Sequence, residues 1–217
     1  MNWTAAGLLE RFAVHGRYYS ATFEHQNFEL RSHLEIFERN KAWPAVAGAN
    51  ADLVAVMMNP GGSRPLQAID AQGWAPAVPD RTQYQLMKLA LHAQSRGVAI
   101  RHIRVINLSD LRTPKSAELF SALKTLKDDS HSLFSPLRRP ELQRALGAKT
   151  VPVLRAWGLS AALNDLASSA VSLTEDRKVL GLTDNRLQYR HPLPQRADLQ
   201  KTWLEALGHQ IEALAPG

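Results

Sequence analysis

The stretch Asp52-Leu53-Val54-Ala55-Val56-Met57-Met58-Asn59-Pro60-Gly61-Gly62 decides the fold class. Residues 53–58 are apolar without interruption over the length of one strand, and Asn-Pro-Gly-Gly is typical of a turn. A strand that is apolar at every position is buried on both faces, as in a parallel sheet covered by helices. The stretch therefore predicts an inner strand of an α/β protein that ends in a turn at Asn59.

Similar apolar segments recur along the chain and alternate with helical patterns. We expect further strands over 100–108, 151–158 and 179–182. We expect helices over 81–96, 116–126, 141–146, 159–168 and 197–213, the first of them capped by Asp80. This alternation predicts a three-layer α/β/α fold with a central, mostly parallel sheet, in one domain over residues 1–217.

The first 51 residues have a different pattern. A helix is expected first, followed by a polar, aromatic-rich segment over 16–40 that includes an antiparallel strand preceding the main sheet.

Composition limits the chemistry and the partners. The 217-residue chain has no cysteine, which excludes disulfides, thiolate zinc sites and a cysteine nucleophile. Its net charge of +6 favours an anionic partner such as nucleic acid. The sequence shows neither a signal peptide nor an apolar run of the roughly 20 residues that a membrane span needs. We therefore expect a cytoplasmic monomer that does not bind membranes.

Three neutral polar side chains lie where apolar segments give way to turns: Asn59, Asn107 and His191. An open α/β sheet gathers such positions at one edge, where ligands bind. The amide of Asn107 matches the Watson–Crick edge of uracil, since its oxygen accepts from N3–H and its nitrogen donates to O4. Taken singly, each residue is also explained as ordinary turn chemistry, or for His191 as a histidine bound to a carbonyl.

The order of these motifs resembles the uracil-DNA glycosylase superfamily. Met57-Met58-Asn59-Pro60-Gly61 is similar to the Gly-x-Asn-Pro-Gly motif of its mismatch-specific and single-strand-selective branches. His191-Pro192-Leu193-Pro194 is similar to a closing His-Pro-Ser-Pro, and Val151 to Gly158 to the penultimate core strand. The resemblance spans residues 52–207 and leaves 1–51 as an N-terminal extension.

The first half also resembles a set of poorly characterised bacterial proteins with Leu-Asn-Pro-Ser, Asp-x-Thr and Asn-Leu-x-x-Leu-Arg motifs. Here Asp80-Arg81-Thr82 and the segment from Asn107 to Arg112 correspond to the second and third of these motifs. The chain is therefore expected to be a divergent branch of the glycosylase fold.

The glycosylase resemblance implies hydrolysis of an N-glycosidic bond in DNA, without metal or organic cofactor. Asn59 would position the attacking water, His191 would donate to O2 of the leaving base, and Asn107 would read the flipped base. Further base-pocket and DNA-contacting residues follow from the resemblance and from the basic residues near the turns. The base-pocket set is Met58, Trp74 and Tyr84, and the DNA-contacting set is Arg64, Arg112, Lys115, Arg190, Gln195 and Arg196, with Arg196 as the wedge.

Three departures from the family pattern lie inside the motifs. Met57 stands where the family usually has a pocket-opening glycine, and Leu193 replaces a serine that contacts phosphate. Asn59 replaces the aspartate of the most active branch, which implies a lower rate.

Three alternatives remain open at this stage. The site would suit a bulky modified base, as met in phage defence, because Met57 and the long loop over 63–79 alter the pocket. A non-catalytic nucleic-acid binding module would bind DNA with steep salt dependence and release no base. A hydrolase of free nucleosides or nucleotides would act on monomers without sensitivity to salt.

Overall fold

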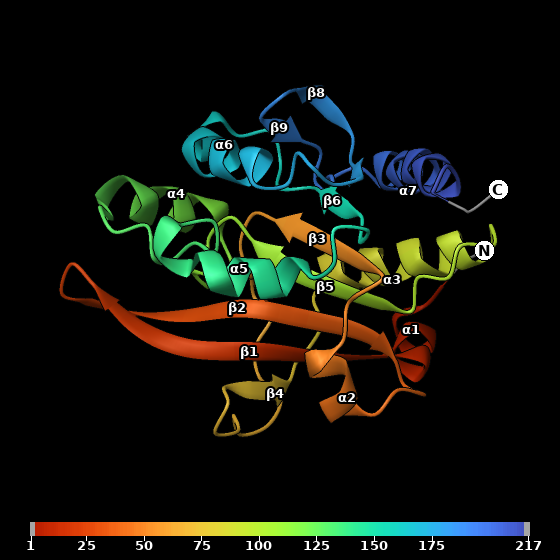
Figure 1. Cartoon of the computed structure of the whole chain (residues 1–217), viewed down its shortest axis with the longest axis horizontal. Coiled ribbons are helices and arrows are strands. Elements are labelled where there is room, and N and C mark those ends of the chain that lie inside the picture. Colours follow the sequence, from red (N-terminus) through yellow and green to blue (C-terminus); the bar gives the residue numbers. More distant parts are fainter. Residues whose placement is uncertain (1–2, 215–217) are drawn as a thin grey trace.

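The apolar run after Asp52 forms strand β3 (Leu53–Met57), in which every residue is buried. The computed structural model describes residues 3–214, and β3 is an inner strand of a seven-stranded sheet in these residues (Figure 1). The strand order is β4-β1-β2-β5-β3-β6-β7. Burial on both faces agrees with the expectation from the uninterrupted apolar pattern.

Four strands form the parallel part of the sheet. β5 (His102–Asn107) and β6 (Val153–Arg155) flank β3, and β7 (Val179–Leu180) pairs with β6. The helices that connect or follow these strands are α3 (Arg81–Gln94), α4 (Ser116–Thr125), α5 (Arg139–Leu146), α6 (Asn164–Ser172) and α7 (Ala197–Glu212). Single-turn 3₁₀ helices at Pro136–Arg138 and Ala161–Leu163 precede α5 and α6. The expected strands and helices are present, with bounds that differ by a few residues.

Three antiparallel strands complete the sheet. β1 (Phe12–Phe23) and β2 (Gln26–Glu38) form a long hairpin, and β2 pairs with β5. β4 (Trp74–Pro76) joins the outer side of β1. The sheet is therefore mixed, and the expected parallel pairing holds from β5 to β7. The N-terminal extension is part of this central sheet.

The remaining elements are small. Helix α1 (Ala5–Arg11) precedes β1, and α2 (Trp43–Gly48) follows β2. Strands β8 (Thr183–Asn185) and β9 (Gln188–Tyr189) form a separate two-stranded hairpin. Among residues 3–214, no helix combines the length and the apolar character needed to cross a bilayer.

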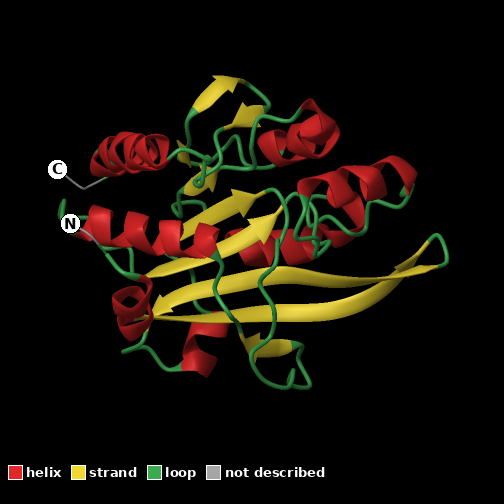
Figure 2. Ribbon diagram, turned by 180° about the vertical axis from the view of Figure 1, so that it is seen from behind, coloured by secondary structure: helices red, strands yellow, loops and turns green. Residues whose placement is uncertain are grey.

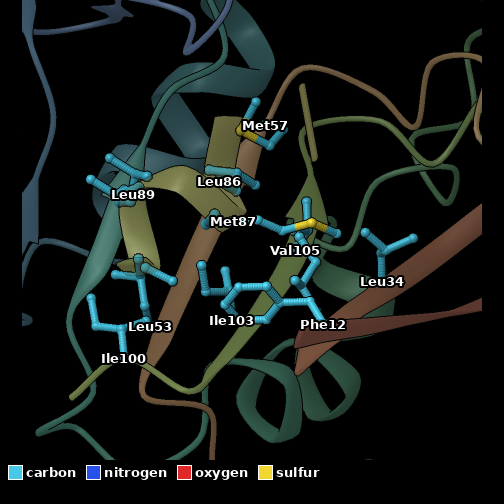
Figure 3. Packing of buried hydrophobic residues seen from close by; sticks show 14 of the residues in the cluster. Phe12, Leu34, Leu53, Met57, Leu86, Met87, Leu89, Ile100, Ile103 and Val105 are labelled. Carbon is cyan, nitrogen blue, oxygen red and sulfur yellow. The ribbon is translucent and has the colours of Figure 1, made fainter. Parts of the chain in front are cut away.

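Helices cover both faces of the sheet (Figure 2). α1, α3 and α7 contribute to one apolar cluster, and α4, α5 and α6 contribute to the other. On the α3 side, Met57 and Leu86 lie together above Val105 (Figure 3). The α/β class is confirmed, with helices packed against both sides of a mixed sheet.

Candidate functional site

A cavity of about 400 Å³ lies at the carboxyl ends of β3 and β5. We call it the polar cavity for the polar side chains in its wall, although apolar atoms make up most of its surface. This volume falls within the range of roughly 300–1,000 Å³ that is common for small-molecule sites. The structure brings Asn59, Asn107 and His191 together in the cavity wall. The other lining residues come from β2, β3, β5, the start of α3 and the loops beside them. They are Arg31, Met57, Met58, Pro60, Gly61, Gly62, Asp80, Arg81, Thr82, Gln83, Leu86, Val105, Thr113, Pro114 and Ser116.

Asn107 presents two unpaired polar groups to the cavity. It is the last residue of β5, opposite Met57 in the parallel ladder, and its side chain is fully buried. Neither Oδ1 nor Nδ2 has a hydrogen-bond partner within residues 3–214. An amide buried without partners costs free energy, so such a group indicates a position completed by a water molecule or a ligand.

The amide of Asn59 has a fixed orientation. Its Nδ2 donates to the carbonyl oxygens of Leu111 and Thr113 at 3.2 and 2.9 Å, and to Thr113 Oγ1 at 3.0 Å. Because carbonyl oxygens only accept, the nitrogen must face them. Oδ1 then points away from this loop as an acceptor at the cavity.

The imidazole of His191 is held in one tautomer. The Leu193 backbone N–H donates to His191 Nδ1 at 3.2 Å, so Nδ1 carries a lone pair. Burial lowers the pKa of His191, which favours the neutral ring. The single ring proton therefore lies on Nε2, which makes this nitrogen a donor.

His191 also lines a second, apolar hollow of about 290 Å³. Leu182, Leu199 and Trp203 supply much of the wall of this hollow. The ring thus stands between a polar and an apolar space, in keeping with its partly buried position.

Arg31 is the main cavity residue that sequence reasoning missed. In the hairpin, Arg17 pairs with His33 and Tyr18 pairs with Arg31, which leaves Ser32 as an extra residue in β2. Leu34 faces the α3 cluster, so strict alternation would send Arg31 to the other face. The bulge reverses the alternation and places Arg31 in the cavity wall. The sequence signal of this irregularity is the run of three polar residues Arg31-Ser32-His33, which interrupts the alternation of apolar and polar residues from Phe28 to Ile36.

The start of α3 supplies a further group of polar residues. Asp80 Oδ1 accepts from the backbone N–H groups of Thr82 and Gln83 at 2.9 and 3.0 Å. Gln83 reaches back to the Asp80 N–H, which completes a capping box. The expected helix cap is confirmed, and it also puts a carboxylate in the cavity wall.

Two residues expected in the base pocket lie elsewhere. Trp74 is on β4, where its ring contacts Trp43 at 4.9 Å between ring centroids. Tyr84 packs against the α1–α3 core and lines a different hollow, beside Trp3 and Leu193. Neither residue lines this cavity, because long-range packing decides where an aromatic side chain lies. Met58 does line the cavity.

The cationic residues near the turns have different surroundings. Arg64 and Lys115 are exposed, and Lys115 pairs with Glu118 at 3.5 Å. Arg112 is largely buried, donates to the Ser63 carbonyl at 3.2 Å, and lies 5.2 Å from the Tyr18 ring centroid. These contacts hold the Arg112 guanidinium inside the protein, which disfavours the expected contact with a DNA phosphate.

The cations near His191 are paired at the surface. Arg190 lines the apolar hollow and pairs with Asp184 at 2.6 Å. Arg196, the expected wedge, pairs with Asp198 at 2.5 Å, and Gln195 beside it is exposed. Both arginines are therefore engaged by carboxylates at the surface.

Comparison with known proteins gives no relative. No protein-family model, curated protein or solved structure matches the chain. The fold and the site define an α/β protein with a cavity at the carboxyl edge of its parallel strands, lined by Asn59, Asn107 and His191.

Proposed function

We propose that the protein is a DNA glycosylase that hydrolyses the N-glycosidic bond of a flipped uracil or another damaged or modified base. The observation that carries this proposal is the convergence of Asn59, Asn107 and His191 on one cavity, with His191 neutral and protonated on Nε2. The order of the sequence motifs around these residues supports the same reading.

The reaction separates charge between the base and the sugar, and the cavity offers one group that would act on the leaving base and one that would act on the attacking water. As the C1′–N bond breaks, its electron pair leaves with the base, and the sugar becomes cationic. Nε2–H of His191 would donate to O2 of the departing base, where negative charge develops. A donor held in place before the reaction stabilises this charge without reorganisation.

Asn59 would act on the water. Its Nδ2 is anchored by the 111–113 loop, so Oδ1 would accept a hydrogen bond from the attacking water. The water oxygen bonds to C1′ and loses a proton to the solvent, while the base anion takes one up. An amide orients water but is a poor base, which is consistent with a modest rate.

Asn107 would read the base. Its unpaired Oδ1 and Nδ2 offer one acceptor and two donors, which complement the N3–H and O4 of uracil. Met57, Leu86 and Val105 give the apolar side of the cavity. Flipping a base costs a few kcal/mol, least in single strands and at mismatches.

The test is a substrate screen at low salt with alkaline cleavage of abasic sites. Single-stranded and duplex oligonucleotides would carry uracil, hypoxanthine, a thymine mismatch or modified cytosines. We expect cleavage at one or more of these bases, and none after His191→Ala. Release of a bulky modified base alone would identify the phage-defence type of substrate.

Two other results would contradict the proposal. Salt-dependent DNA binding with no cleavage of any oligonucleotide would indicate a non-catalytic module. Hydrolysis of free nucleosides that is insensitive to salt would indicate a nucleoside hydrolase.

A further inference from the structure

Arg31 brings an unpaired positive charge into the polar cavity. Its side chain is 2% exposed, and Nε and Nη1 have no hydrogen-bond partner in the described part of the chain. Burial lowers the pKa of its guanidinium, yet an arginine retains its charge in proteins. A buried charge without partners costs folding free energy. We therefore expect an acceptor from outside the chain to bind this guanidinium.

Arg155 is another buried arginine, and its donors are paired with groups of the protein itself. Arg155 on β6 donates from Nε to Thr174 Oγ1 at 3.1 Å and from Nη1 to Tyr189 Oη at 3.0 Å. Its Nη2 donates to the Val171 carbonyl at 3.0 Å. The protein thus satisfies one buried guanidinium with its own groups, whereas the donors of Arg31 remain available to a ligand.

The charges around Arg31 do not neutralise it. No carboxylate within residues 3–214 lies within 4.0 Å of its guanidinium. The Asp80 carboxylate acts to raise the pKa of Arg31, but its Oδ1 accepts hydrogen bonds from the start of α3. Arg112 adds a second positive charge on the same side.

A nearby amide matches the same type of ligand. Asn107 contributes an unpaired amide donor to the cavity wall. A guanidinium and an amide together are donors for a small oxygen anion. Tyr18, opposite Arg31 in the hairpin, lies close to the guanidinium but is not part of the cavity wall.

We infer that Arg31 and Asn107 form an oxyanion-binding site inside the polar cavity, for a carboxylate on a nucleobase or the phosphate of a nucleotide. The inference rests on the proposed function for the nucleobase character of the ligand. The anion itself follows from the unpaired guanidinium. Arg31 is thus a specificity-determining residue, and the N-terminal hairpin supplies it.

The experiment measures binding without DNA, by isothermal titration calorimetry in a phosphate-free buffer at low salt. The probes are two matched pairs: uracil-6-carboxylate against uracil, and deoxyuridine 5′-monophosphate against deoxyuridine. We expect at least one anion to bind about tenfold or more tightly than its neutral counterpart, as charge-assisted hydrogen bonds predict. The pair that shows the difference identifies the source of the anion.

Variants assign the effect to Arg31. Arg31→Met should reduce the preference to less than about twofold, and Arg31→Lys should leave part of it because a single ammonium lacks the planar fork. The matched control is Arg139→Met, which removes an exposed positive charge on α5 at the other face of the sheet and should retain the full preference. In the wild-type protein, the Nε–H resonance of Arg31 should shift when the bound anion is added, which tests the site even where a variant fails to fold.

Several outcomes would overturn the inference. These are equal binding of both members of each pair, no binding of either anion, or an anion preference retained in Arg31→Met. Failure of the glycosylase proposal is seen separately, as the absence of abasic sites in the oligonucleotide screen, while anion binding by Arg31 persists.

Discussion

Arg31 lies opposite Tyr18 across the β1–β2 hairpin, although the neighbouring pair is Arg17 and His33. The extra residue, Ser32, accounts for this shift by one position. As a result, the Arg31 side chain lies on the face of the sheet that carries the polar cavity, whereas His33 lies on the other face. A single inserted residue in a strand thus links the N-terminal hairpin to the site.

Arg31 and Arg155, which are both buried, should respond oppositely to removal of their charge. Arg31→Met removes an unpaired charge, so we expect an unchanged or higher free energy of unfolding, by up to about 3 kcal/mol. Arg155→Met leaves buried acceptors at Thr174 and Val171 without their donor, so we expect a loss of about 3 kcal/mol. Urea unfolding followed by circular dichroism measures both. Equal destabilisation of the two variants would show that Arg31 has a structural role.

Substitution of Asn59 or His191 should impair catalysis much more than it impairs DNA affinity. We expect Asn59→Ala and His191→Ala each to lower the rate of base release by at least about 100-fold, because each removes a positioned group. DNA binding should change little, as measured by fluorescence anisotropy. His209→Ala alters an exposed histidine on α7 and should retain the full rate. Full activity in both site variants would show that the assigned site is wrong.

An aspartate at position 59 should destabilise the protein. The Asn59 amide nitrogen faces the carbonyl oxygens of Leu111 and Thr113, and a carboxylate oxygen there would face acceptors only. We expect Asn59→Asp to lower the free energy of unfolding by about 1–3 kcal/mol at pH 7. The loss should diminish at low pH, where the carboxyl group is protonated and donates again. A pH-independent loss would argue against this explanation.

Gly16 keeps the Tyr18 ring in place. A Cβ atom at position 16 would lie 2.8 Å from that ring, which is too close for a van der Waals contact. Gly16→Ala should therefore displace the ring and cost about 1–3 kcal/mol of stability. Gly48→Ala on α2 meets no atom within 4 Å among the described residues and should be neutral or stabilising by up to about 1 kcal/mol. Thermal denaturation of the two variants makes the comparison.

Acid should destabilise the protein through His33. Burial and nearby arginines lower the pKa of His33 to about 3, from 6.5 in the unfolded chain. Between these two values the unfolded state binds more protons, so stability is lost as the pH falls below 6.5, with a slope approaching about 1.4 kcal/mol per pH unit. Wild type should lose stability relative to His33→Gln from pH 7 to pH 4, measured by urea unfolding.

Asp110 has the opposite effect on stability at acidic pH. Burial raises its pKa to about 6, so the native state takes up this proton more readily as the pH falls. Both proteins in the His33 comparison carry Asp110, and its contribution therefore cancels in the difference. A difference that does not change with pH would contradict the assignment to His33.

Local sequence patterns were sufficient for much of the fold. The uninterrupted apolar residues of β3 predicted burial on both faces, and Asp80 with Gln83 predicted the start of α3. The positions of Asn59 and Asn107 at strand ends predicted that they would meet at one edge of the sheet. These features depend on periodicity and turn chemistry, which are properties of neighbouring residues.

The sequence did not predict the positions of side chains that depend on pairing between distant segments. Trp74 and Tyr84 lie outside the cavity because β4 and α3 dock where the whole core places them. The antiparallel hairpin joins β5, although its residues gave only a general strand signal.

The sequence by itself determined the α/β class, the buried strand at 53–57 and the turns that carry Asn59, Asn107 and His191. Only the tertiary structure decided that Arg31 shares their cavity. The physical reason is that a strand's alternation is a local property, whereas the location of a bulge is fixed by register against a partner strand. The tautomer of His191 likewise depends on the folded turn, in which the Leu193 N–H reaches Nδ1.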